Sequence, residues 1–440
     1  MTGAALTPQL SEAEARPSAV KAWWTVAIFC VCAILSYTDR QILGLLVDPL
    51  RADLAISDTQ VSLLQGLAFA IIYSFAGLPM GRLADMVSRR RLIMAGVVIW
   101  TAATVACGLV ADFGQLFAAR VFVGIGEAAL APAAISMIGD IFPPQRRGTA
   151  LGIFAMGMIV GSGAALSVGG QLLQAAQDGW FQGWPIVGQR APWRAVLLLL
   201  ALPGVVMLLL LATIAEPIRH KRSWQGSGVP ISAVFAGKRH LLLPLLAAMA
   251  FMSAGDFALL NWTPSLLARR FHEQPGLIGS QLGAIAMTAG ALGALIGGWL
   301  SDRLGAIGGL TLRARTAALI CLVAAPAATI AFWTTTGPIY VVFGLWVFAS
   351  TCVGTMGIAA VQQSVPSEAR GLTTAVNAFS NMTVGLGLGT MVTALITEHV
   401  FHDPLAVGKS LSLVTFFAAC VGIISFLIAS QRACEQNVKG

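Results

Sequence analysis

Charged side chains are scarce in this 440-residue sequence. Asp, Glu, Lys and Arg make up 10% of it, whereas they make up about 25% of an ordinary soluble domain. Hydrophobic residues account for 57%. A chain with so little polar surface cannot enclose its apolar residues in a water-soluble particle, and a disordered chain would need far more charge. Soluble enzymes and disordered proteins are therefore excluded, and a helical membrane protein remains.

Motifs for nucleotide, metal or covalent chemistry are also missing. The sequence has no GxxxxGKS or GxxxxGKT loop, so it offers no site of that kind for ATP. Its seven Cys are scattered without a CxxC pair, and its five His lie in loops or at the ends of apolar runs. No paired nucleophile and base is visible. We therefore expect no enzyme, no metal site and no cofactor, and an ion gradient or the cargo's own gradient as the energy source for transport.

What the sequence has in abundance is long apolar runs. Each is roughly 20 residues or longer, enough to cross about 30 Å of hydrocarbon as a helix. A helix satisfies its backbone hydrogen bonds within one segment, which makes it the structure expected for a lipid-exposed run. We predict twelve membrane-spanning helices over residues 22–46, 58–83, 91–111, 113–141, 148–175, 193–215, 241–268, 277–302, 312–333, 337–363, 370–400 and 405–430.

The 27 Lys and Arg residues are divided unevenly between the predicted loops. With the N-terminus placed in the cytoplasm, nineteen fall on the cytoplasmic side, six fall outside, and Arg40 and Arg120 lie within spans. This threefold excess agrees with the positive-inside rule. We therefore expect both termini in the cytoplasm, and we interpret the net charge of +8 as membrane topology rather than as a nucleic-acid-binding surface. Compact loops and short tails favour a bacterial inner membrane.

The chain divides into two halves that repeat each other. A Gly81-Arg-Leu-Ala-Asp85 segment after the second span returns 217 residues later as Gly298-Trp-Leu-Ser-Asp302, and a Pro-rich segment before the fifth span returns after 223 residues. Such a duplication implies a cavity between the halves that opens to each side in turn. We predict a cytoplasmic tail, a first six-helix bundle, a cytoplasmic linker, a second six-helix bundle and a second tail, over residues 1–21, 22–215, 216–240, 241–430 and 431–440.

Three segments carry a resemblance to a known family. Gly81-Arg-Leu-Ala-Asp85-Met-Val-Ser-Arg-Arg90 resembles the signature between the second and third helices of the major facilitator superfamily. Tyr37-Thr-Asp-Arg40 and Arg120-Val-Phe-Val-Gly-Ile-Gly-Glu-Ala128 resemble its Spinster branch, whose animal members export sphingosine-1-phosphate or lysolipids. The resemblance implies an all-α membrane fold of twelve helices in two pseudo-symmetric six-helix bundles, and a monomer as the usual state.

Four charged residues fall inside or near the ends of predicted spans, where charge is costly and calls for a reason. Asp39 lies about 25 Å along the first span, and Arg120 lies about 10 Å below the outer end of the fourth, so their depths in the membrane are comparable. Glu127 lies two turns beyond Arg120 on nearly the same face, and Arg40 points about 100° away from Asp39. We expect these four residues to form a network in the first half.

Their chemistry suggests roles in transport. Arg40 and Arg120 stay charged and can hold an anionic head group such as a phosphate or carboxylate. Asp39 and Glu127 can take up a proton when they are buried, which makes them the candidates for proton coupling. The alternative is a static ion pair that only fixes the packing of the helices.

The family resemblance implies a gating role for the repeated segments. It implies that Asp85 pairs across the interface between the halves and that Arg89 and Arg90 anchor the loop. Asp302 and Arg303 would have the same role in the second half. The alternative for the basic members is ordinary positive-inside charge. The gating candidates are Gly81, Asp85, Arg89, Arg90, Asp302 and Arg303. Polar residues that could line the cavity, or alternatively bridge helices, are Tyr37, Asp256, Asn261, Asn377 and Asn381.

These observations favour a secondary active transporter that works by alternating access. The Spinster resemblance implies a proton-coupled carrier of an amphipathic anion, such as a lysolipid or sphingoid phosphate. One alternative keeps the fold and moves small organic or sugar acids, since the two intramembrane arginines would also suit a carboxylate. Another is a passive channel, a scramblase-like protein or a receptor, against which stands the gating signature present in both halves.

Overall fold

The computed structural model describes residues 18–217, 237–366 and 369–439, and every regular element in these ranges is helical. Apolar runs form helices here because a lipid-exposed backbone finds no other hydrogen-bond partner. Most of the predicted N-terminal tail and of the predicted linker lies outside the described residues. The all-α fold expected from the sequence is confirmed.

The first bundle comprises six crossings, two of which contain a short break. The second crossing joins a π-helical turn to α4 and α5, and the fourth joins α7 to α8. The elements are α2 (Ala19–Gln41), η1 (Ile42–Gly44), α3 (Val47–Leu54), α4 (Asp58–Ser62), η2 (Leu63–Leu67), α5 (Ala68–Met86), α6 (Arg89–Cys107), α7 (Phe113–Glu127), α8 (Leu130–Ile141), α9 (Pro144–Gln177) and α10 (Pro192–Ala212).

The second bundle has its own irregularities, chiefly two π-helical segments, η5 and η6, in the eleventh crossing. Its elements are α12 (Arg239–Phe271), α13 (Pro275–Ala324), η3 (Ala325–Phe332), α14 (Thr336–Ser364), α15 (Arg370–Ser380), η5 (Asn381–Leu388), α16 (Gly389–Leu395), η6 (Ile396–Val400), η7 (Pro404–Ala406) and α17 (Val407–Lys439).

Helix α13 accounts for two crossings rather than one. Its 50 residues would extend about 75 Å if straight, far more than a bilayer is thick. At Gly309 the backbone leaves the helical conformation, with φ 58° and ψ −146°, a region that only glycine adopts readily. The chain therefore turns back at this residue. Eleven continuous helical stretches in the described ranges are long and apolar enough to span a membrane, and they make the twelve predicted crossings because the stretch Pro275–Phe332 crosses twice.

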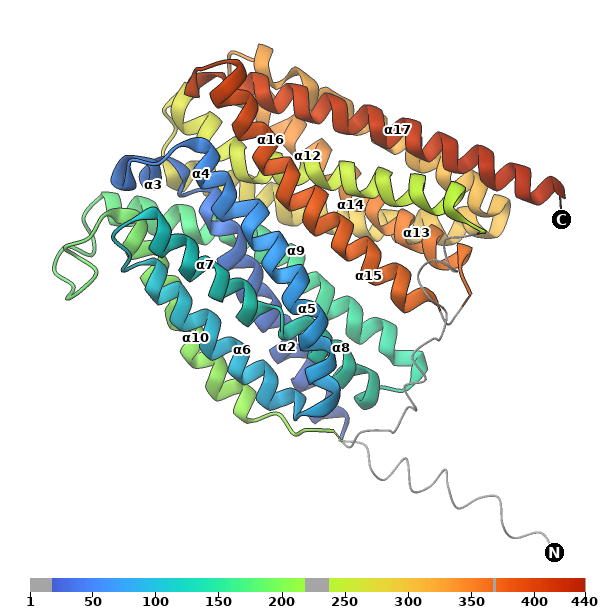
Figure 1. Cartoon of the computed structure of the whole chain (residues 1–440), viewed down its shortest axis with the longest axis horizontal. Coiled ribbons are helices and arrows are strands. Elements are labelled where there is room, and N and C mark those ends of the chain that lie inside the picture. The colour runs from blue at the N-terminus through green and yellow to red at the C-terminus, as the bar shows by residue number, and fades with distance from the viewer. Residues whose placement is uncertain (1–17, 218–236, 367–368, 440) are drawn as a thin grey trace, which may run out of the picture.

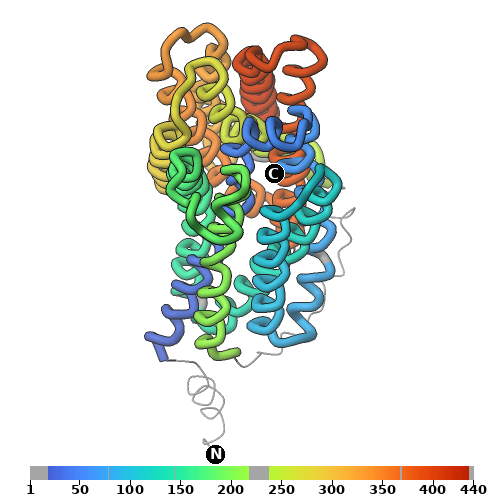
Figure 2. Tube along the Cα trace, turned by 90° about the vertical axis from the view of Figure 1, so that its left-hand side faces the viewer, coloured from blue at the N-terminus to red at the C-terminus, as the bar shows by residue number. Residues whose placement is uncertain are grey.

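The two bundles lie side by side and differ in how closely their ends approach each other (Figures 1 and 2). We call the end that carries Ala19, the turn between α5 and α6, and the last residues of α17 the terminal end. We call the opposite end, with α3 and α4, the far end; it lies at the left of Figure 1 and faces the viewer in Figure 2. The bundles meet at the far end and diverge towards the terminal end.

Helices α9 and α13 form a close contact between the bundles through small residues. A Cβ atom on Gly163 would lie 2.5 Å from the carbonyl oxygen of Gly283, and one on Gly279 would lie 2.2 Å from that of Leu166. Glycine at these positions lets the two backbones approach without side chains between them. Both positions lie in the part of each helix nearer the far end, so this contact joins the bundles there.

Candidate functional site

A buried ion pair joins α2 to α7 in the middle of the first bundle. Arg40 Nη2 lies 2.8 Å from Glu127 Oε2, and the Ser36 hydroxyl donates a second hydrogen bond of 2.9 Å to the same oxygen. Arg40 and Glu127 are 2% and 1% exposed. Breaking such a pair would leave one charge buried without compensation, which is strongly unfavourable. Each of the two residues is therefore the charge partner of the other.

A second pair lies beside the first. Arg120 Nη1 lies 3.8 Å from Asp39 Oδ1 and donates a hydrogen bond of 3.3 Å to the Asp39 backbone carbonyl. The Thr104 hydroxyl donates to Asp39 Oδ2 over 2.5 Å. All four charged residues of the predicted network thus come together, as two Arg and two carboxylates. Thr104 on α6 is a member that sequence reasoning missed, although a polar residue in an apolar run was the available signal.

Three aromatic rings surround the guanidinium of Arg40. Its Cζ atom lies 4.5 Å from the ring centre of Tyr37, 4.7 Å from that of Phe69 and 4.6 Å from that of Tyr73. Ring faces attract a cation and shield it from water at the same time. Phe69 also faces Arg120, at 5.7 Å. The two rings from α5 were not predicted; their i, i+4 spacing on one helical face was the signal.

The charged network is not fully hydrogen-bonded within the described residues. Asp39 Oδ1, Arg40 Nε, Glu127 Oε1, and Nε and Nη2 of Arg120 are buried polar atoms without a hydrogen-bond partner. Buried polar atoms are normally paired, so each such atom asks for an explanation. Three donor nitrogens on the two arginines and two acceptor oxygens on the two carboxylates therefore have unused hydrogen-bonding capacity.

A cavity of about 190 Å³ lies between the bundles. It is lined from the first bundle by Tyr37 and Gln41 on α2 and by three residues of α9, and from the second bundle by residues of α12, α13 and α14 that include Asp256. None of the four network residues lines it. Arg40 lies directly behind the ring of Tyr37, so one side chain separates the cavity from the network.

Two of the five predicted lining residues, Tyr37 and Asp256, line this cavity, and the other three are not among the residues that do. The Asn261 amide is buried and donates to the Phe257 carbonyl of its own helix over 2.8 Å. Asn377 and Asn381 lie on α15 and at the start of η5, and each has a buried Oδ1 atom without a hydrogen-bond partner among the described residues.

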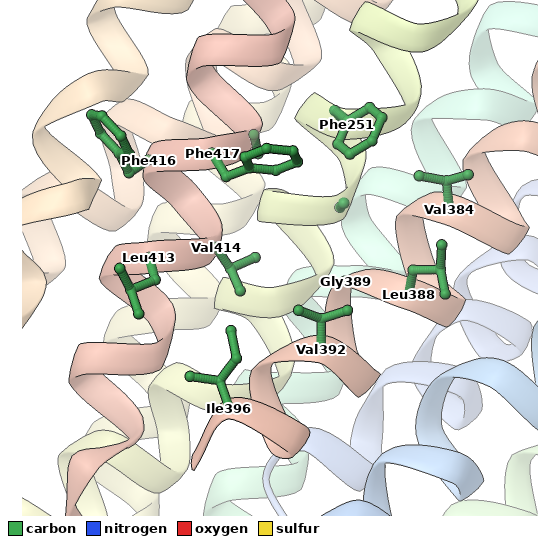
Figure 3. Close-up of a pocket in the computed structure, with 12 residues that line it drawn as sticks. Phe251, Val384, Leu388, Gly389, Val392, Ile396, Leu413, Val414, Phe416 and Phe417 are labelled. Carbon is green, nitrogen blue, oxygen red and sulfur yellow. The ribbon is translucent and has the colours of Figure 1, made fainter. Parts of the chain in front are cut away.

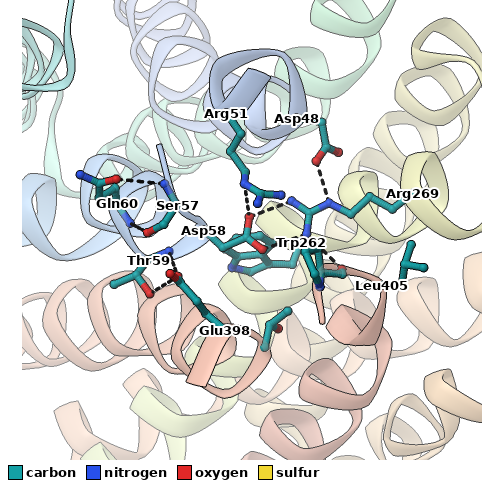
Figure 4. A network of polar contacts seen from close by, with 12 residues as sticks. Asp48, Arg51, Ser57, Asp58, Thr59, Gln60, Trp262, Arg269, Glu398 and Leu405 are labelled. Carbon is teal, nitrogen blue, oxygen red and sulfur yellow. Dashed lines mark hydrogen bonds and ion pairs between the residues drawn. The ribbon is translucent and has the colours of Figure 1, made fainter. Parts of the chain in front are cut away.

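At the far end, ion pairs cross from one bundle to the other (Figure 4). Arg269 of α12 lies 2.6 Å from Asp48 and 2.8 Å from Asp58, and Arg51 lies 3.1 Å from Asp58. We call these four residues the far-end ion-pair group. Beside it, Glu398 Oε2 accepts hydrogen bonds of 3.0 and 2.7 Å from the backbone N–H and hydroxyl of Thr59.

The start of α4 is fixed by its own sequence. Ser57 accepts a hydrogen bond from the Gln60 backbone N–H, and the Gln60 side chain accepts one from the Ser57 backbone N–H, which is a capping box. This cap holds Asp58 and Thr59 in the first turn, where they meet the second bundle. Sequence reasoning counted Arg51 and Arg269 only as outer charges and missed this group, since its partners lie more than 200 residues apart.

At the terminal end, the predicted anchors Arg89 and Arg90 bind within the first bundle. Arg89 lies 2.5 Å from Asp140 and 3.1 Å from Glu216. Glu216 also accepts from the backbone N–H groups of Arg89 and Arg90, over 3.0 and 2.9 Å, and from the Ser88 hydroxyl. Burial raises the pKa of Glu216, but the Arg90 N–H and the other donors at the start of α6 outweigh burial and lower this pKa below its ordinary value.

The remaining gating candidates lie at the surface of the terminal end. Asp85 and Asp302 are exposed, and the exposed Arg303 lies over the ring of Trp299, with 5.3 Å between its Cζ atom and the ring centre. A Cβ atom on Gly81 would meet no neighbour within 4 Å. The structure therefore places these residues where the bundles diverge and leaves room around Gly81.

A second, wholly apolar pocket of about 430 Å³ opens on the side of the second bundle (Figure 3). Residues from α12, α17 and the irregular eleventh crossing line it, among them Phe251, Val392 and Phe417. Phe417 and its neighbour Phe416 are 58% and 60% exposed, which on a membrane-spanning helix means contact with lipid. Helix α12 separates this pocket from the central cavity.

No described group of three or more His, Cys, Asp or Glu side chains could hold a metal ion. The geometry instead combines a paired charge network, a cavity between two bundles, and ion pairs that cross between the bundles at one end. The model of the Major Facilitator Superfamily matches residues 29–390. The chain belongs to the Major Facilitator Superfamily. It is therefore a multi-pass membrane transporter and not an enzyme.

Within the superfamily, the chain is similar to proteins of known kind. It is 30% identical over 423 residues to an MFS-type efflux pump of Mycolicibacterium smegmatis, with 94% of this chain and 93% of that protein covered. It is 30% identical over 297 residues to Protein spinster of Drosophila melanogaster; the match covers 64% of this chain and 46% of spinster, so the chain spans about half the length of that relative.

A solved structure shares most of the fold. It is that of a bacterial homologue of the human lysosomal transporter Spinster, in an inward-facing and occupied conformation, with a TM-score of 0.79 and 25% identity. The alignment covers 94% of this chain and 98% of that one. Together with the similarity to spinster, it confirms the Spinster-like branch of the superfamily predicted from the segments around Asp39 and Glu127.

Proposed function

We propose that the chain is a proton-coupled secondary transporter that moves an amphipathic anion of the lysolipid or sphingoid phosphate type by alternating access. The observation that carries the proposal is the buried Arg40–Glu127 pair, which lies one side chain away from a cavity shared by both bundles. Similarity to Spinster proteins supports the same class of transporter.

Coupling follows from the chemistry of this pair. When Glu127 takes up a proton it no longer balances the charge of Arg40, and the guanidinium needs another anion. An anionic group that enters the cavity beside Tyr37 can supply that balance once the ring moves aside. Asp39 and Arg120 are the adjacent pair that can take part in the exchange, because each has a buried polar atom without a hydrogen-bond partner in the described residues.

The orientation is part of the proposal. The excess of Lys and Arg on one side supports placing the terminal end, with both termini, in the cytoplasm of a bacterium and the chain in its inner membrane. The far-end contacts then close the outer side, and the conformation is inward-facing. In this orientation Gly81, Asp85, Asp302 and Arg303 gate the cytoplasmic side in the opposite state. We propose a monomer as the working unit.

The size of the cavity favours a second candidate cargo. Its volume of about 190 Å³ is below the 300–1,000 Å³ of pockets that enclose drug-sized ligands, and a small organic or sugar acid would fit it without further opening. A lipid cargo would need its tail outside the cavity. The apolar pocket beyond α12 offers a surface of the right polarity for such a tail.

The test is flux in proteoliposomes under an imposed pH gradient. Labelled lysolipid or sphingoid phosphate is expected to move with the gradient in the wild type, and Glu127→Gln is expected to abolish the gradient-driven part. Glu435→Gln, which changes an exposed carboxylate paired with Arg432, is the matched control and should behave as the wild type.

Three other results would change the proposal. If small acids but not lipids drive proton movement, the second candidate is correct. If lipid moves equally with and without the gradient and in Glu127→Gln, coupling through Glu127 is wrong and the movement is passive. If no cargo moves, a receptor is left.

A further inference from the structure

We propose that one water molecule binds inside the first bundle, between α2, α6 and α10, and joins Asp39 to Thr101 by hydrogen bonds. Thr101 is then a positioning residue that acts on Asp39 through this water. The water site does not depend on the proposed function. The effect of Thr101 on transport rests on it, because Asp39 is one of the two carboxyl groups proposed to take up a proton.

A small space behind Asp39 is the first part of the argument. Asp39 of α2, Thr101 and Thr104 of α6 and Gly204 of α10 are among the residues that line it. It leaves about 10 Å³ for the centre of a water molecule, and one water needs about 10–15 Å³ measured in this way. It shares no lining residue with the central cavity. The space therefore has the size of a single water and is separate from the cavity.

The second part is the set of polar atoms on its wall. Asp39 and Thr101 are 6% and 9% exposed, and Asp39 Oδ1 and Thr101 Oγ1 have no hydrogen-bond partner among the described residues. Buried polar atoms are normally paired with protein groups or with ordered water. The hydroxyl oxygen of Thr104, which donates to the other oxygen of Asp39, can also accept. Two to four polar partners are what a buried water requires, and this wall offers three.

Gly204 shows where the Thr101 hydroxyl points. A Cβ atom on Gly204 would overlap with Thr101 Oγ1, so this oxygen is directed across the helix contact towards α10. Gly204 lines the same space. The hydroxyl therefore faces the space, and the missing side chain at residue 204 leaves the room that a water molecule needs.

The chemistry of water suits a carboxyl group that gains and loses a proton. Arg120, the other partner of Asp39, can only donate hydrogen bonds. Water donates to a carboxylate oxygen and accepts from a protonated carboxyl, so it remains bonded to either form. A water fixed by Thr101 therefore keeps the Asp39 side chain in place while its proton changes.

An experimental structure of the full chain, at a resolution that shows ordered water in the protein interior, tests the site directly. We expect a density peak about 2.5–3.0 Å from both Asp39 Oδ1 and Thr101 Oγ1. The peak should be lost in Thr101→Val and in Gly204→Ala, whose methyl group fills the space. The inference is overturned if this place has no peak while other buried waters are visible, or if the Thr101 hydroxyl turns to a carbonyl of its own helix.

Gradient-driven flux in proteoliposomes tests the positioning role. Thr101→Val keeps the shape of the side chain and should slow the initial rate about ten-fold, the size expected when one partner of a buried hydrogen bond is removed. Thr101→Ser keeps the hydroxyl and should restore the rate. Thr415→Val is the matched control, because the buried Thr415 hydroxyl bonds only to carbonyls of its own helix. Thermal unfolding reports whether each variant is folded.

The outcomes separate the site from the transport function. An unchanged rate in Thr101→Val, or an equal fall in Thr101→Ser or Thr415→Val, would contradict the positioning role. A water peak in a wild type that shows no gradient-driven flux would uphold the site and contradict the proposed transport function instead.

Discussion

The far end and the terminal end of the molecule use similar ion pairs in opposite ways. At the far end, Arg269 of the second bundle binds Asp48 and Asp58 of the first, and Glu398 binds Thr59 across the same boundary. At the terminal end, each polar contact we have described, such as that of Arg89 with Asp140, stays within one bundle. Contacts of the first kind depend on how the bundles are placed, and contacts of the second kind do not.

This difference separates two properties of a transporter, namely the ratio of its conformational states and the stability of its fold. Contacts across the boundary stabilise one conformational state relative to the other, because they break when the far end opens. Contacts within a bundle stabilise the fold in both states equally, and a group that interacts equally with both states shifts nothing. The four predictions below test this division, from the largest expected effect to the smallest.

Arg89→Ala should destabilise the fold most and leave the conformational ratio unchanged. Arg89 is 2% exposed and has two carboxylate partners, Asp140 and Glu216, which would both lose their counter-charge. We expect a loss of about 3–5 kcal/mol, the usual cost of removing one partner of a buried pair. Thermal unfolding of the purified protein measures the loss. A shifted distance between far-end labels, with unchanged stability, would contradict the division.

Arg269→Ala should open the far end with a smaller change in stability. Asp58 keeps Arg51 as a partner, so we expect a cost near the lower limit for a broken buried pair, about 3 kcal/mol, or about a hundred-fold change in the ratio of states. Electron–electron distance measurements between spin labels on the exposed residues Asp178 and Thr334 would detect the shift.

The neighbouring arginine supplies the matched control for that experiment. Arg270 donates to the Ala331 carbonyl within the second bundle, so Arg270→Ala removes the same type of side chain without touching the boundary. It should leave the distance distribution as in the wild type. An equal shift in both variants would show that the far-end ion-pair group does not control the state.

Gly279→Ala should also open the far end, with a weaker effect than that of Arg269→Ala. The added methyl group would lie 2.2 Å from the Leu166 carbonyl oxygen and 2.8 Å from Gly170 Cα, and backbone atoms cannot rotate out of the way. We expect about 1–3 kcal/mol of strain in the closed far end, read from the same label distances. Gly354→Ala, whose methyl group would meet nothing within 4 Å, should have no such effect.

The smallest effect concerns pH and the terminal end. The pKa of Glu216 is lowered in the fold, so its contribution is present above the ordinary pKa of glutamate and is lost as the pH falls through the lowered value. Acidification below about pH 4.3 should therefore reduce the unfolding temperature. Glu216→Gln should remove part of this pH dependence. An unchanged pH profile in that variant would show that Glu216 does not stabilise the start of α6.

Hydropathy and charge patterns were enough to predict the fold and the membership of the charge network. The depth of Asp39 and Arg120 in their spans predicted that they meet, since a helix converts residue number directly into height. Arg40 points about 100° away from Asp39 around the helix, and its side chain therefore contacts Glu127 and not Arg120. Twelve spans were predicted correctly even though the eighth and ninth are joined without a long loop, because Gly309 makes the turn by itself.

The partners that sequence could not supply are those fixed by the packing of distant helices. Periodicity places Phe69 and Tyr73 on one face of α5, but it does not indicate that this face meets Arg40. Nor does any sequence pattern indicate that Arg269 meets Asp58 across the boundary. The same limit explains why Asn261, Asn377 and Asn381 were predicted to line the cavity but are not among the residues that do. Their residue type suggested the cavity wall, but the rotation of each helix decides which of its faces is presented to the cavity.

The distribution of tyrosine has a practical consequence. The chain has only three, and two of them, Tyr37 and Tyr73, lie against Arg40, while the third, Tyr340, donates a hydrogen bond to Glu273 near the far end. Biosynthetic fluorotyrosine would therefore give a fluorine spectrum of three lines. Two lines would sense the charge of the central guanidinium and the third would sense the surroundings of Glu273 near the far end, so one spectrum would report on both places in the same sample.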